Sequence, residues 1–134
     1  MAASAQAVIP VLVYGDIQRA HDFLVRAFGF GPGGVQADGE GNPVHGEVDA
    51  FGQAIWLHLP ILDKQLGPPK DGTLALGGLV VRVPDVDAHC ARSRAEGADV
   101  TRDPSDQPYG QREYEARDPE GHRWWVATVI DRPA

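Results

Sequence analysis

Apolar and polar residues follow one another in a pattern that predicts alternating strands and helices. An apolar, β-branched run at residues 8–14 is typical of a strand. Asp16 then stands where a helix N-cap is expected, and apolar residues recur at helical spacing up to Gly29. The Gly-Pro-Gly-Gly segment at residues 31–34 predicts a turn. The further strands expected in this half of the chain lie at residues 35–37, 44–50 and 53–59.

The second half of the chain begins the same series again. Asp85 is another N-cap candidate, and the helix expected at residues 86–96 ends at Gly97, a residue that readily adopts the left-handed conformation. Residues 103–110 are expected to form a loop, and residues 60–73, rich in proline, glycine and lysine, are interpreted as a linker. The strands expected in this half lie at residues 74–83, 100–101, 111–117 and 122–130.

The two halves match under one constant shift of 69 positions. The matches fall at the helix cap, at an Asp-x-x-Gly turn and at the tryptophan after this turn, and they predict a duplicated βαβββ unit. The units lie at about residues 7–60 and 74–130, within a single α+β domain spanning residues 1–134. Because each sheet is too small to close alone, we expect the units to pair into one curved mixed sheet with a concave cleft. The matching pairs are Val11 with Val80, Asp16 with Asp85, Ile17 with Val86, Asp49 with Asp118, Gly52 with Gly121 and Trp56 with Trp125.

Composition narrows the function classes. The 134 residues are 43% hydrophobic and 23% charged, as in an ordinary soluble globular protein. The net charge of −7 disfavours nucleic acid or an anionic membrane surface as a partner, because both require basic patches. A single cysteine excludes an intramolecular disulfide framework and a thiolate metal cluster. The N-terminal residues lack the features of a signal peptide, and the chain is expected to be cytoplasmic.

Two segments of the chain resemble a known superfamily. The segments are residues 10–30 and 109–127, and the second contains the pattern Tyr-Gly-x-Arg-(x)5-Asp-Pro-x-Gly-His that ends at His122. Together they resemble the vicinal oxygen chelate superfamily, which includes glyoxalase I, extradiol dioxygenases, fosfomycin-resistance transferases and bleomycin-resistance binding proteins. The resemblance implies the glyoxalase/bleomycin-resistance fold and a homodimer, but it does not select one activity, since one fold hosts many functions.

The resemblance also indicates where a metal ion would be bound. The enzymes of this superfamily place His or Glu ligands near the start of the first strand of each unit and a Glu in its last strand. The corresponding positions in this chain are Ile9, Gly78, Trp56 and Trp125. None of these side chains can donate an electron pair to a metal ion, so the resemblance implies no metal at the usual site and no cofactor.

Strand alternation predicts which side chains line the cleft. Trp56 and Trp125 are expected to point inward at matching positions of the two units. Their indoles suit stacking on planar rings and cations, and carboxylates beside them would hold a positive group. The candidate ligand-binding residues are Trp56, His58, Val80, Arg82, Tyr109, Glu113, Glu115, Arg123 and Trp125, with Tyr109 at the rim.

Several of these candidates also have a purely structural interpretation. The two tryptophans could fill a cleft that has lost its metal. Glu113 and Glu115 could be solvated strand residues that pair with Arg123 or Arg82.

Two main functions follow from this set. The first is a metal-free dimeric binding protein that sequesters a small aromatic or cationic compound, with antibiotics among the candidates. The second is a metal-dependent lyase or dioxygenase of the same superfamily that uses shifted ligands, such as His58 with Glu113 or Glu115. A small interaction module without a ligand is a third possibility.

Overall fold

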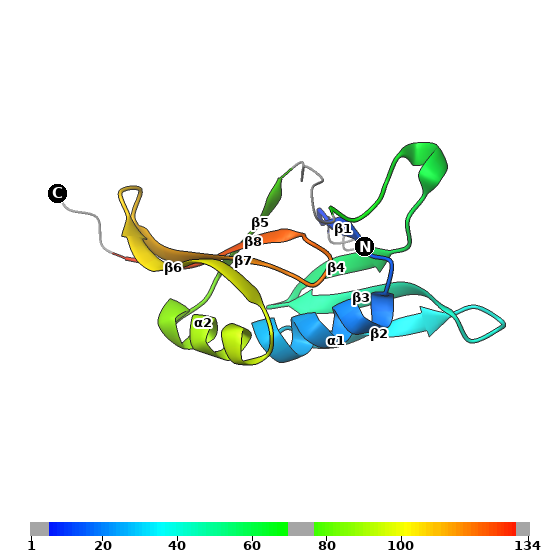
Figure 1. Cartoon of the computed structure of the whole chain (residues 1–134), viewed down its shortest axis with the longest axis horizontal. Coiled ribbons are helices and arrows are strands. Elements are labelled where there is room, and N and C mark those ends of the chain that lie inside the picture. Colours follow the sequence, from blue (N-terminus) through cyan, green and yellow to red (C-terminus); the bar gives the residue numbers. More distant parts are fainter. Residues whose placement is uncertain (1–5, 70–76, 131–134) are drawn as a thin grey trace, which may run out of the picture.

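The computed structural model describes residues 6–69 and 77–130 and contains two βαβββ modules (Figure 1). A short 3-10 turn, Leu62–Lys64, follows the first module. The first module consists of β1 (Val11–Val13), α1 (Ile17–Phe28), β2 (Gly31–Ala37), β3 (Pro43–Ala50) and β4 (Gln53–His58). The second module consists of β5 (Gly78–Arg82), α2 (Val86–Ala95), β6 (Asp99–Gln107), β7 (Gln111–Arg117) and β8 (Arg123–Val129).

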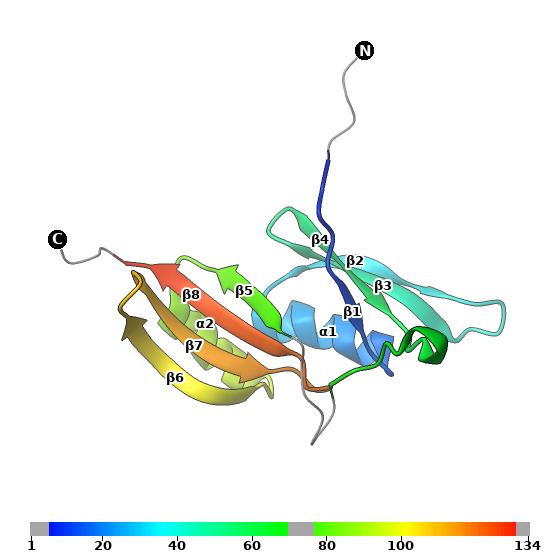
Figure 2. The same ribbon diagram turned by 90° about the horizontal axis from the view of Figure 1, so that it is seen from above.

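Each module forms its own four-stranded mixed sheet. The strand orders are β1-β4-β3-β2 and β5-β8-β7-β6, and only the first pair of each sheet is parallel. Both helices cover the same side of the two sheets, so each sheet has an open face on the other side (Figures 1 and 2). The α+β class and the duplicated topology are therefore confirmed, with two adjacent sheets in place of one continuous sheet.

The parallel strand pairs have the same register in both modules. Val11 lies opposite Trp56, and Val80 lies opposite Trp125, so the shift of 69 positions holds for this pair of strands. The antiparallel partners differ by one position, because Glu47 lies opposite Trp56 whereas Glu115 lies opposite Trp125.

The helix signals of the sequence are confirmed. Asp16 accepts a hydrogen bond from the amide of Arg19, and Asp85 accepts one from the amide of Ala88. Gly29 and Gly97, with φ angles of 77° and 95°, provide the left-handed residues that follow the two helices.

Two of the strands are longer than the sequence predicts. The predicted turn at residues 31–34 is part of β2, where a Cβ on Gly33 would lie only 2.5 Å from the carbonyl oxygen of Glu47. The predicted loop at residues 103–110 belongs largely to β6, a polar edge strand whose register shifts near Pro104. Proline is tolerated there because an edge strand needs fewer ladder hydrogen bonds than a central one.

The opening strands are shorter than expected. Only Val11–Val13 of the run at residues 8–14 and, among the described residues 77–83 of the second run, only Gly78–Arg82 are strands. Residues 74–76 and the linker residues 70–73 lie outside the described part of the chain.

The core lies between the helices and the covered faces of the sheets. Four side chains are fully buried there: Trp124, Tyr114, Leu57 and Val126. Strand alternation predicts this burial, because it places them on the face opposite to Trp56 and Trp125. In the described residues, the structure contains no helix that is long and apolar enough to cross a membrane.

Asp118 joins the two modules through a buried hydrogen-bond network. One carboxylate oxygen accepts bonds from the Tyr14 hydroxyl at 2.6 Å and from the Trp124 indole at 3.1 Å. The other oxygen accepts from the backbone amides of Glu120 and His122. Burial, together with the nearby negative charge of Asp118, raises the pKa of Tyr14 well above its usual value, so this hydroxyl remains a hydrogen-bond donor.

The turn between β7 and β8 supplies hydrogen-bond acceptors at the start of α1. The Glu120 carboxylate accepts hydrogen bonds from the amides of Gly15 and Asp16, at 2.7 and 2.9 Å. These amides precede α1, where unpaired donors and the helix dipole favour a negative charge.

Side chains of α2 bond to carbonyl groups at the C-terminal end of α1. The His89 ring bonds the Phe28 carbonyl through Nε2 at 2.8 Å, and Arg92 donates to the Arg26 carbonyl. Because a carbonyl can only accept, Nε2 carries the proton, and Nδ1 of a neutral ring accepts from the Tyr114 hydroxyl at 2.7 Å. Burial lowers the pKa of His89, which favours this neutral form.

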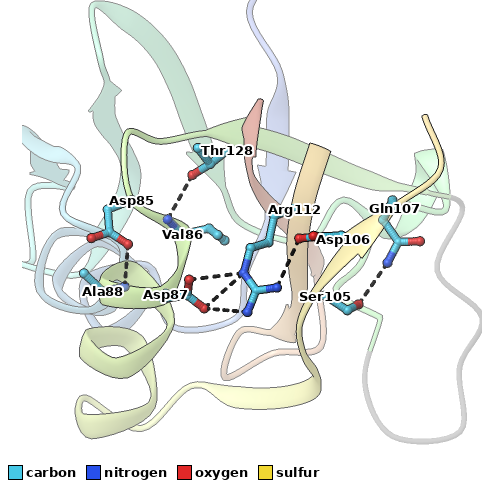
Figure 3. Close-up of polar contacts among 9 residues, drawn as sticks. All are labelled: Asp85, Val86, Asp87, Ala88, Ser105, Asp106, Gln107, Arg112 and Thr128. Atoms are coloured by element: carbon cyan, nitrogen blue, oxygen red, sulfur yellow. Dashed lines mark hydrogen bonds and ion pairs between the residues drawn. The ribbon is translucent and has the colours of Figure 1, made fainter. Parts of the chain in front are cut away.

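Polar contacts fix the start of α2 on its own sheet (Figure 3). Thr128 accepts from the Val86 amide at 2.9 Å, and Arg112 reaches from β7 to both Asp87 and Asp106 (Figure 3). These contacts fix the start of α2 against the covered face of the second sheet, on the side opposite to the open face.

Candidate ligand-binding site

Trp125 is held on the open face of the second sheet by a carboxylate. Its indole Nε1 donates a hydrogen bond to Glu115 Oε1 at 2.8 Å. The other Glu115 oxygen accepts bonds from Arg123 and Thr101, both at 2.8 Å. Partial burial alone would raise the pKa of Glu115, but the bonds from Thr101 and Trp125 and the charge of Arg123 lower it. Glu115 is therefore an ionised group whose hydrogen-bonding capacity is already used.

The first sheet holds its tryptophan in the same way. The Trp56 indole donates to Glu47 Oε1 at 2.7 Å, and the ring of His45 packs edge-on against it, with centroids 5.5 Å apart. Both carboxylates lie directly across the sheet from their indoles. The duplicated modules thus repeat a carboxylate–indole pair on their open faces.

Apolar side chains beside both indoles are exposed. Trp56 itself is 39% exposed, and Val11, its neighbour on the parallel strand, is 50% exposed. Val80, the equivalent neighbour of Trp125, is 58% exposed. Exposed apolar groups of this kind, fixed in place and rimmed by charges, are typical of small-molecule and protein contact sites.

A groove separates the two modules. It has a volume of about 460 Å³ and is lined mainly by apolar side chains from the segment before β1, the β3–β4 turn, the start of β4 and β5. Val80 and Arg82 line this groove together with Phe51 of the turn. Phe51 has a φ of 57°, a conformation that is uncommon for a non-glycine residue and holds its ring against Phe30.

Glu113 occupies a different environment from Glu115. It lies on the same open face, because both alternate with the buried Tyr114 along β7. Its side chain is buried, and Oε1 has no hydrogen-bond partner among the described residues. Arg102 approaches this oxygen to 3.6 Å, which is too long for a hydrogen bond.

The predicted site residues form several groups, not one. Glu115, Arg123 and Trp125 are in direct contact, and Val80 and Arg82 share the groove. Trp56 and His58 lie on the first sheet, on strand β4. The His58 Nδ1 contacts the carbonyl of the adjacent Leu59 at 2.7 Å. Tyr109 lies in the β6–β7 turn, exposed and away from the module junction.

Sequence reasoning missed three residues of these groups. Glu47 holds the Trp56 indole, Thr101 donates to the Glu115 carboxylate, and Phe51 lines the groove. Glu47 could have been found by placing β3 opposite β4 across the short Phe51–Gly52 turn. Thr101 lies at a register shift between β6 and β7, which alternation alone does not locate.

The metal site of the resembled enzymes does not fit this chain. A Cβ on Gly78 would lie 2.5 Å from the Arg123 carbonyl oxygen and 2.7 Å from the Trp125 ring, so a ligand side chain at this position would displace the indole. No group of three or more His, Cys, Asp or Glu side chains in residues 6–69 and 77–130 is placed to hold a metal ion. His58 belongs to the first sheet and Glu113 and Glu115 to the second, so the proposed shifted ligands are not brought together within the described chain.

Comparisons with known proteins agree with this architecture. An uncharacterised protein of Mycobacterium bovis is 32% identical over 128 residues, which cover 92% of this chain and 84% of that protein. The crystal structure of TioX from Micromonospora sp. ML1 is 34% identical, with a TM-score of 0.72 and coverage of 94% of this chain and 100% of that one. TnmS3, an antibiotic binding protein from Streptomyces sp. CB03234, is 27% identical, with a TM-score of 0.71 and coverage of 96% and 99%.

A family model covers nearly the whole chain. The model of the Glyoxalase/Bleomycin resistance protein/Dioxygenase superfamily matches residues 6–126. The match includes both carboxylate–indole pairs and the Asp118 network between the modules. The chain therefore belongs to the glyoxalase/bleomycin resistance protein/dioxygenase superfamily.

Proposed function

We propose that this protein binds a small aromatic compound without a metal ion and sequesters it without chemical change. The observation that carries the proposal is the repeated carboxylate–indole pair, Glu47 with Trp56 and Glu115 with Trp125. Each carboxylate fixes the edge of an indole, and Trp56, which is 39% exposed, offers ring surface for contact with another ring. A ring fixed in this way loses little side-chain entropy when it binds a ligand.

The chemistry of the site favours a planar ligand that carries a positive group. An indole face attracts cations as well as aromatic rings, and the open faces carry several carboxylates. Among residues 6–69 and 77–130, no cationic side chain pairs with Glu47, so its negative charge supports binding of a cation beside Trp56. Similarity to TnmS3, an antibiotic binding protein, places antibiotics among the compounds to be tested.

We also propose that the binding cleft forms between two copies of the chain. The open faces of both sheets point to the same side of one chain, so they do not face each other (Figure 2). A two-fold axis would place the first module of one copy against the second module of another and create two equivalent clefts. The exposed Val8, Phe51 and Val80, which line the groove between the modules, support an apolar interface there, and Val8 is 96% exposed.

Binding is tested by quenching of tryptophan fluorescence with planar aromatic probes, of which 9-aminoacridine is the first. We expect saturable quenching in the wild-type protein and at least tenfold weaker binding when Trp56→Ala and Trp125→Ala are combined. The buried Trp124 remains in this double variant as the fluorescence reporter. Leu62→Ala is the control, because Leu62 is exposed in the turn after the first module.

Two outcomes would contradict the proposed function. One is a panel of planar probes, cationic and neutral, that causes no saturable quenching in the wild-type protein. The other is unchanged affinity in a correctly folded double variant, which would mean that the indoles fill the fold and do not contact the ligand.

A further inference from the structure

Two glutamates of β7 lie on the same open face and have opposite hydrogen-bonding environments. Glu115 accepts bonds from the Trp125 indole, Arg123 and Thr101. Glu113 is only 3% exposed, and its Oε1 has no hydrogen-bond partner among the described residues. One of the two carboxylates therefore has a structural role, and the other has an unused acceptor.

An unpaired buried carboxylate oxygen is costly for a protein. Removing a charged acceptor from water without a replacement hydrogen bond carries the full desolvation penalty. The nearest cation, Arg102, stays 3.6 Å away and is itself partly in solvent. A donor that reached Glu113 from outside the chain would remove this penalty, and a ligand without such a donor would not.

The position of Glu113 fits a ligand that stacks on Trp125. Glu113 lies across the sheet from Ala127, whereas Glu115 lies across from Trp125, so the two pairs are separated by two residues along the strands. This spacing corresponds to about 7 Å, roughly the distance from the centre of a fused aromatic ring system to a substituent on its edge. Ala127, which lies across the sheet from Glu113, has a small side chain and is fully buried.

We propose that Glu113 accepts a hydrogen bond from an N–H group on the edge of the bound aromatic compound and thereby selects amino-substituted ligands. This inference rests on the proposed binding function and assigns the ligand class that the site prefers. Glu115, in contrast, positions Trp125 and makes no such selection. A site with a buried acceptor discriminates strongly against ligands that cannot satisfy it.

Three probes that share one ring system separate hydrogen bonding from charge. At pH 8, 9-aminoacridine is a cation with N–H donors, 10-methylacridinium is a cation without them, and acridine is neutral without them. We expect the wild-type protein to bind 9-aminoacridine at least tenfold more tightly than either of the others, as measured by fluorescence quenching and calorimetry.

Substitutions of the two glutamates assign the preference to one residue. We expect Glu113→Leu to reduce the preference for 9-aminoacridine to less than threefold, with Glu113→Gln intermediate because its amide oxygen is a weaker acceptor. Affinity for acridine should remain within threefold of wild type in both variants. Glu115→Gln is the matched control: it should weaken binding of all three probes to a similar extent, because it releases Trp125.

Thermal unfolding of the ligand-free proteins provides a second readout. Glu113→Leu and Glu113→Gln should leave the unfolding temperature unchanged or raise it, because they remove a buried charge whose oxygen Oε1 has no hydrogen bond among the described residues and whose ion partner Arg102 stays 3.6 Å away. Glu115→Gln should lower it, because it weakens three hydrogen bonds.

The outcomes distinguish this inference from the proposed function. Equal binding of all three probes by wild type and Glu113→Leu would overturn the inference and leave the binding function intact. Equal binding of the two cations, with acridine weaker, would show that the site recognises charge and not the N–H group, and would also overturn it. Absence of binding by every probe would overturn the proposed function and the inference together.

Discussion

A single carboxylate, Asp118, accepts four hydrogen bonds, and the one from Tyr14 connects the two halves of the molecule. Two of its donors are buried side chains, the Tyr14 hydroxyl and the Trp124 indole. Without the carboxylate, both donors would remain in an apolar environment that offers no water. The residue is therefore expected to matter for stability.

Substitution of Asp118 tests this role. We expect Asp118→Ala to lower the free energy of unfolding by about 3 kcal/mol, because buried donors lose a charged acceptor. Asp118→Asn should cost about half as much, since one acceptor oxygen remains. Asp63→Ala, at an exposed position in the 3-10 turn, is the control and should change stability by less than about 0.5 kcal/mol. The free energies are measured by urea unfolding. If Asp118→Ala and Asp63→Ala unfold with the same slope and the same midpoint, the expected loss of stability in Asp118→Ala is contradicted.

The roles of individual site residues could be predicted only in part from the sequence. Strand alternation correctly places Trp56 and Trp125 opposite the faces that bear Leu57 and Trp124. The same reasoning treats Glu113 and Glu115 alike, because alternation gives the face of a residue and not its partners. Their difference arises from the donors that surround Glu115, which are Trp125, Arg123 and Thr101, and Thr101 lies at a register shift in β6.

At the scale of secondary-structure elements, local signals predict the helices better than the edge strands. The N-cap carboxylates and the left-handed glycines act within a few residues, so the sequence shows both helices directly. Strands β2 and β6 are rich in glycine or polar residues and exist because they pair with β3 and β7. Pairing between distant segments is a tertiary effect, and it overrides weak local preference.

Glycines in and next to β2 provide a test of this tertiary effect. Gly33→Ala would place a Cβ 2.5 Å from the Glu47 carbonyl oxygen, so we expect it to lower the free energy of unfolding by about 2–3 kcal/mol. Gly39→Ala, where no heavy atom lies within 4 Å of the added Cβ, should be neutral or slightly stabilising. Chemical denaturation of both variants measures the difference, and equal stabilities would show that β2 does not approach β3 as closely as described.

At the scale of the whole molecule, the modules are connected mainly by their helices and turns and not by a shared sheet. Contacts between α1 and α2, the Asp118 network and the Glu120 carboxylate hold the halves together. Within residues 6–69 and 77–130, no helix or strand lies over the open faces of the two sheets (Figure 2). This arrangement explains why a single concave cleft, as expected from the sequence, is not closed within one chain.

The proposed dimer predicts a measurable mass in solution. Light scattering coupled to size-exclusion chromatography should give twice the 14.4 kDa mass of one chain. We expect Val80→Asp to shift the protein toward the monomer, because a buried charge at the apolar interface is costly. Leu62→Asp, outside the groove, should leave the mass unchanged. A monomeric wild-type protein at all concentrations, or a dimeric Val80→Asp variant, would contradict the proposed interface.

The Glu120 carboxylate has a consequence for how such proteins can diverge. It supplies the acceptors for amides at the start of a helix that belongs to the other half of the chain, Gly15 and Asp16. Recombination that exchanged one half with that of a distant relative would leave this helix end without its acceptor, unless the incoming half carried a carboxylate at the same place. An exchanged half is therefore expected to support the start of α1 only where it carries such a carboxylate.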